Sequence, residues 1–142
     1  TDAYYDEFPN AAAPNELNYP GQSAYLDFSG ETLPGIAKYS GNIGIEWNQP
    51  FGNNGGEIFW NANVSYSDKF NTDSSLSTYG WIPARTTWDI GFGYNGNIAG
   101  GNFGVSLITK NAFDDDTPLG SSWNSYNPPE PRWVGFQITG SF

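Results

Sequence analysis

The sequence predicts an all-β fold: an antiparallel meander of about six long strands taken from a transmembrane β-barrel. Three observations support this prediction. Apolar and polar residues alternate over long stretches, as they do in strands with one lipid-facing and one polar face. These stretches are long enough for a tilted transmembrane strand, which needs about 9–11 residues. Short and long connections also alternate along the chain, which is typical of outer-membrane barrels.

Residues 132–142 show the alternation most clearly. Successive strand side chains point to opposite sides, so apolar side chains share one face and small or polar side chains share the other. The apolar set is Val134, Phe136, Ile138 and Phe142. Outer-membrane barrels close with a strand of this pattern, so we expect residues 132–142 to form a barrel-closing strand.

The same alternation predicts the other strands. It recurs over residues 38–48, 56–68, 85–95 and 102–112, and residues 2–8 are expected to add a further strand. Phe59 and Ile108 are the imperfections, because each is an apolar residue on an otherwise polar face. No stretch has the apolar period of a helix.

The expected strands and their connections form a single segment, residues 1–142. Those at residues 49–55 and 96–101 are short and rich in Gly and Asn. The long loops are expected at residues 9–37, 69–84 and 113–131. In bacterial barrels, short turns face the periplasm and long loops face outward.

Composition excludes several classes of function. Aromatic residues make up 18% of the chain and charged residues 14%, whereas soluble domains average about 25% charged residues. Cys and His are absent, which removes thiol chemistry and the commonest general base. We therefore expect neither an enzyme nor a bound cofactor. The net charge of −10 argues against nucleic acid as a partner. Met is also absent, so we expect a processed product or a fragment.

Two groups of residues are candidate binding sites. Asp114, Asp115 and Asp116 could hold Ca²⁺, which prefers oxygen ligands, but they lack EF-hand spacing, and a solvated acidic loop is the alternative. Trp81, Trp123 and Tyr126 lie on the long loops and could contact a ligand by stacking. Such aromatic side chains also suit loop packing or an interfacial belt.

Three segments resemble the TonB-dependent outer-membrane receptors. Residues 27–38, DFSGETLPGIAK, resemble the SG-x-x-L-P-x-x-P-K loop of that family, with Ala37 in place of Pro. Residues 109–114, TKNAFD, resemble its KNLFD segment, with Ala112 in place of Leu. Pro131, Arg132 and Gly135 match its PR-x-x-G ending. The three segments occur in the order found in the family and cover essentially the whole chain.

The resemblance implies the C-terminal portion of a receptor barrel in the outer membrane of a Gram-negative bacterium. Such receptors import nutrients such as siderophores, vitamins or glycans. The plug and the TonB-contacting segment of the family have no counterpart here, so we do not expect this chain to transport alone. The expected partners are the rest of the barrel and outer-membrane lipid.

A structural role is the alternative hypothesis. About six strands cannot close a wide barrel, and open sheet edges recruit further strands. Low charge and many aromatic residues also suit cross-β stacking. Under this hypothesis, copies of the fragment assemble with one another into an extracellular, amyloid-like filament with a refolded cross-β core.

Overall fold

The computed structural model describes residues 2–53, 55–98 and 100–141 and shows an all-β chain. Two compact units are present. The sheet unit comprises Gly41–Ser65, Thr86–Asp115 and Glu130–Phe142. The loop unit comprises Thr1–Ser40, Tyr66–Arg85 and Asp116–Pro129.

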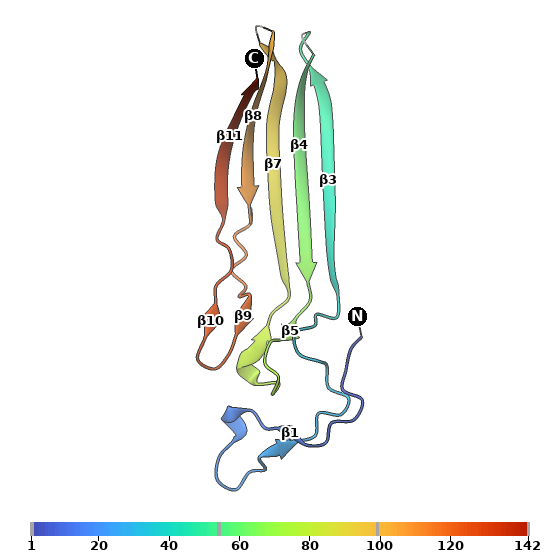
Figure 1. Ribbon diagram of the computed structural model, residues 1–142, viewed down its shortest axis with the longest axis vertical. Coiled ribbons are helices and arrows are strands. Elements are labelled where there is room, and N and C mark those ends of the chain that lie inside the picture. Colours follow the sequence, from blue (N-terminus) through green and yellow to red (C-terminus); the bar gives the residue numbers. More distant parts are fainter. Residues whose placement is uncertain (1, 54, 99, 142) are drawn as a thin grey trace. The chain divides into compact units, whose positions relative to one another are not determined.

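Five long strands form one open antiparallel sheet (Figure 1). The order across the sheet is β11-β8-β7-β4-β3, so each long strand lies beside the long strands that precede and follow it in the sequence. The outer strands are β3 and β11, and the described strands do not close into a barrel. The long strands are β3 (Ser40–Phe51), β4 (Gly56–Ser67), β7 (Arg85–Ile98), β8 (Gly101–Lys110) and β11 (Trp133–Ser141).

The expected strand at residues 2–8 is wrong. This segment contributes only an isolated bridge between Tyr4 and Thr32. Tyr5 and Phe8 instead turn toward Phe28, with ring centroids 6.3 and 6.4 Å from that of Phe28. Packing these rings together removes apolar surface from water, and within the described ranges the sheet has five long strands instead of the expected six or so.

Each of the three long loops contains a small antiparallel ladder that the sequence did not predict. In every case, two strands of two residues pair within the same loop. The pairs are β1 (Ala11–Ala12) with β2 (Tyr25–Leu26), β5 (Phe70–Asn71) with β6 (Trp81–Ile82), and β9 (Gly120–Ser121) with β10 (Tyr126–Asn127).

The helical pieces are short. Both η1 (Asn15–Leu17) and η2 (Thr78–Gly80) are 3₁₀ turns in the loop unit. No helix in the described ranges is long and apolar enough to cross a membrane.

The two units differ in what they bury. Ala11, Phe28 and Ile82, the buried apolar residues of the described chain, all belong to the loop unit. Within the described part of the sheet unit, the buried positions are glycines and Asn111, and no apolar side chain is buried. The sheet as it stands therefore lacks a hydrophobic core of its own.

Candidate functional site: the two faces of the sheet

One side of the sheet, here called the apolar face, exposes a continuous array of large apolar side chains. The register aligns Phe92 with Leu107 and Leu107 with Phe136 across three strands. Their exposed fractions are 56%, 47% and 67%, respectively. Other exposed apolar residues of this face, on β3, β4, β7 and β11, are Ile43, Ile45, Trp47, Trp60, Ile90, Val134 and Ile138. In other proteins, large exposed apolar surfaces form contacts with membranes, proteins or ligands.

Aromatic side chains crowd the turn end of the apolar face. The ring of Phe51 meets that of Tyr94 edge-on, with 6.2 Å between the ring centroids. Tyr94 lies over Gly56 and Gly96, where an added Cβ would collide with its ring. The absence of a side chain at these two glycines therefore leaves room for the Tyr94 ring.

The opposite side, here called the polar face, carries small and polar residues from every long strand. Asn42 donates a hydrogen bond from Nδ2 to Ser65 Oγ at 2.8 Å, which links β3 to β4. Lys110 Nζ lies 2.6 Å from Asp89 Oδ2 and joins β8 to β7. Such contacts belong on a surface in contact with water and polar groups.

Glycines lie beside Ile108 and Phe59, the two residues that interrupt the polar pattern of β8 and β4. Ile108 pairs with Gly91 on one side and with Gly135 on the other. The ring of Phe59 lies over Gly93, whose added Cβ would come 2.5 Å from Phe59 Cζ. The ring of Phe59 therefore fills the space left by Gly93 on the neighbouring strand, whereas the space over Gly91 is taken by the Asn61 side chain.

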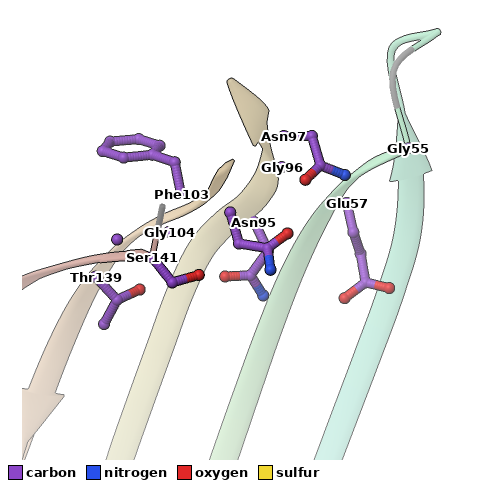
Figure 2. Close-up of a pocket in the computed structure, with 11 residues that line it drawn as sticks. Gly55, Glu57, Asn95, Gly96, Asn97, Phe103, Gly104, Thr139 and Ser141 are labelled. Carbon is purple, nitrogen blue, oxygen red and sulfur yellow. The ribbon is translucent and has the colours of Figure 1, made fainter. Parts of the chain in front are cut away.

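A polar pocket of about 420 Å³ lies on the sheet near its short turns (Figure 2). Asn95 and Thr139 both pair with Gly104, so this glycine separates the two polar side chains. An added Cβ at Gly104 would lie 2.8 Å from Asn95 Oδ1 and 2.6 Å from Thr139 Oγ1. Figure 2 also shows Glu57 and Ser141 at this pocket. The pocket offers amide, hydroxyl and carboxylate groups, which suit polar contacts to a ligand or to another segment of chain.

The residues expected in the closing strand lie at the edge of the sheet. Val134, Phe136 and Ile138 belong to β11 and are 57%, 67% and 64% exposed. Phe142 lies outside the described residues. Trp133, in the same strand, folds its ring over Gly135 on the polar face.

Two of the three acidic residues at positions 114–116 accept hydrogen bonds from backbone amides. Asp114 Oδ1 accepts a hydrogen bond from the Arg132 amide at 3.2 Å. Asp115 Oδ2 accepts one from the Thr86 amide at 3.1 Å. Asp116 is exposed. Over the ranges that the structure describes, no group of three acidic side chains is arranged to hold a metal ion.

The three loop aromatic residues that were expected to contact a ligand have different surroundings within the loop unit. Trp123 is 63% exposed and lines a pocket of about 510 Å³ with Tyr79, Asn15 and Glu16. Trp81 lines other pockets, and the Lys69 ammonium lies 5.8 Å from its ring centroid. Tyr126 belongs to β10 and is 59% exposed.

Glu16 is the part of the Trp123 pocket that sequence reasoning missed. Its Oε1 accepts hydrogen bonds from Ser77 Oγ at 2.7 Å and from the Thr78 amide at 2.8 Å. The hydrogen bond from the Ser77 hydroxyl lowers the pKa of Glu16, so the side chain is a carboxylate at neutral pH. These partners lie 61 and 62 residues away in the sequence, and no local pattern signals such a contact.

No protein-family model matches this chain, and no curated protein or solved structure matches it.

Proposed function

We propose that this chain is the C-terminal portion of the membrane-spanning barrel of a TonB-dependent outer-membrane receptor for nutrient uptake. The nutrient would be a siderophore, a vitamin or a glycan, and the chain would not transport alone. The observation that carries the proposal is the sheet with one exposed apolar face, one polar face and no buried apolar side chain among its described residues. A soluble sheet buries its apolar face against another layer, whereas a barrel strand turns that face toward lipid.

Strand length and connection length support the same proposal. The long strands have 12, 12, 14, 10 and 9 residues, and a tilted transmembrane strand needs about 9–11. Short turns follow β3 and β7, whereas long loops follow β4 and β8. Under the proposal, the short turns lie in the periplasm and the loops lie outside the cell.

The outer strands define the expected partner. All twelve residues of β3 are exposed, and β11 is exposed at eight of its nine positions. Unpaired backbone groups are costly in the bilayer core, so β3 and β11 would pair with the remaining strands of the receptor. Outer-membrane lipid would then cover the apolar face, and the polar face would line the barrel interior.

Neighbouring positions in β11 provide the test. The chain has no Cys, so Phe136→Cys and Gln137→Cys variants each take a single nitroxide label. In detergent micelles, we expect the label at 136 to be relaxed mainly by oxygen, which partitions into the apolar phase. The label at 137 should respond mainly to a water-soluble nickel chelate, because adjacent strand residues face opposite sides. Equal responses at both positions would contradict a lipid-facing side.

A structural filament is the second candidate, and the two open edges of the sheet favour it. Exposed outer strands such as β3 and β11 are templates for pairing with another copy of the chain. Apolar faces from separate copies could then pack face to face, as they do in cross-β assemblies. This candidate predicts regular polymers in buffer without detergent, which electron microscopy would reveal.

A further inference from the structure

We infer that the pocket formed by Asn15, Glu16, Tyr79 and Trp123 binds a small organic cation of the alkylammonium class. These four residues line one cavity of about 510 Å³ inside the loop unit. Small-molecule pockets typically have volumes of about 300–1,000 Å³. The inference concerns the loop unit alone and does not depend on the proposed membrane role.

The charge of the pocket comes from Glu16. Its Oε1 accepts hydrogen bonds from Ser77 Oγ, the Thr78 amide and Thr78 Oγ1, at 2.7, 2.8 and 3.2 Å. Its Oε2 is shielded from solvent and has no hydrogen-bond partner within the described chain. A carboxylate oxygen without a donor retains negative charge that a nearby cation would stabilise.

The walls of the pocket suit an alkylated ammonium group. Tyr79 is 54% exposed and Trp123 is 63% exposed, so both rings remain available to a ligand. Cations are attracted to the faces of Trp and Tyr rings, and this interaction is used to recognise quaternary ammonium groups. The combination of ring surface and carboxylate matches a ligand that is both apolar on its outside and positively charged.

Other ligand classes fit the pocket less well. A divalent metal needs several oxygen ligands, and the described residues of the lining include a single carboxylate. A neutral sugar could hydrogen-bond to Glu16 Oε2, the Asn15 amide, the Tyr79 hydroxyl and the Trp123 indole N–H, but it would leave the negative charge of Glu16 without a counter-charge. An anion is disfavoured by the Glu16 charge, since no Lys or Arg is among the described residues that line the pocket.

The test uses the 142-residue chain in a polyoxyethylene detergent, which carries neither an ammonium group nor a sugar. Choline is titrated and followed by calorimetry. The control ligand is the alcohol in which a tert-butyl group replaces the trimethylammonium group, because it has the same shape without the charge. We expect saturable choline binding that is about tenfold tighter than binding of the neutral alcohol.

Two variants locate the binding. Glu16→Gln keeps the size of the side chain, removes its charge and should weaken choline binding by about tenfold or more. The matched control is Glu31→Gln, an exposed carboxylate of the same unit outside this pocket, which should leave binding unchanged. Because Glu16 also holds η2, the exposed Trp123→Leu substitution provides a second variant and should also weaken choline binding.

Several outcomes would overturn the inference. Equal affinity for choline and the neutral alcohol would show an apolar pocket without charge selectivity. An equal loss in Glu31→Gln and Glu16→Gln would show attraction by the net charge of the chain. Unchanged binding in Trp123→Leu, binding of glucose in place of choline, or no saturable binding would also contradict it. None of these results bears on the nitroxide test of the sheet, so the two proposals fail separately.

Discussion

At the residue scale, Glu16 connects distant parts of the loop unit. Its carboxylate joins η1 to η2 through Ser77 and Thr78. Hydrogen bonds to an ionised group are stronger than those between neutral groups. The folded loop unit therefore holds Glu16 in its charged form, and its stability depends on that charge.

The stabilisation from Glu16 should depend on pH. The Ser77 hydrogen bond lowers the pKa of Glu16 below its ordinary value of 4.5. Its contribution is therefore complete above pH 4.5 and is lost as the pH falls through the folded pKa. Thermal unfolding of the native chain and Glu16→Gln should differ most near neutral pH, and the difference should shrink in acid. A difference that does not change with pH would contradict this role.

Gly93 provides a second prediction at this scale. An added Cβ would lie 2.5 Å from Phe59 Cζ and 2.6 Å from the backbone oxygen of Val105. Because the backbone oxygen cannot move aside freely, Gly93→Ala should destabilise the sheet by about 1–3 kcal/mol. Denaturant unfolding in detergent measures the change. Gly41→Ala is the control, since nothing lies within 4 Å of its added Cβ, and an equal loss there would argue against a steric cause.

At the element scale, the long strands could be predicted and the short ones could not. Residues 56–68 were expected to form a strand, and the structure has one at Gly56–Ser67. Twelve alternating residues give a clear period, whereas a pair such as Phe70–Asn71 has no period to detect. The error at residues 2–8 has a related cause, because alternation does not show whether aromatic side chains will cover a sheet or cluster with Phe28.

Asn111 organises the loop end of β8 and gives the prediction at this scale. This residue is 6% exposed and has a φ of 47°. Its Nδ2 donates to the Asp115 and Glu130 carbonyls, both at 2.9 Å, and its Oδ1 accepts from the Asp115 amide at 2.9 Å. Asn111→Ala would leave these backbone groups without their partner and should cost about 1–3 kcal/mol.

Denaturant unfolding of the Asn111→Ala variant measures that cost. The exposed Asn97, on β7, offers the matched control, and Asn97→Ala should change stability by less than about 0.5 kcal/mol. Similar losses in the two variants would mean that the hydrogen bonds of Asn111 do not fasten the strand ends.

At the scale of the whole molecule, the candidate sites were only partly predictable. The apolar face followed from alternation, which fixes the face of each residue once a strand is given. The polar pocket at Asn95, Gly104 and Thr139 depends on register, and register is a property of strand pairs that no single strand reveals. The pocket beside Trp123 required a contact between Glu16 and Ser77, which are 61 residues apart.

The two candidate functions differ in what completes the sheet. A receptor barrel completes it with further strands of the same receptor and covers the apolar face with lipid. A filament completes it with copies of the same chain. Both use the exposed strands β3 and β11. The two functions are therefore distinguished by whether the chain forms ordered particles in detergent or ordered polymers in plain buffer.

Electron microscopy of the purified 142-residue chain, with and without detergent, tests the membrane proposal most directly. The receptor proposal predicts discrete particles in detergent and irregular aggregates or precipitate in plain buffer, because the apolar face needs an apolar cover. Regular filaments in plain buffer would contradict it and would establish self-assembly as the behaviour of this chain.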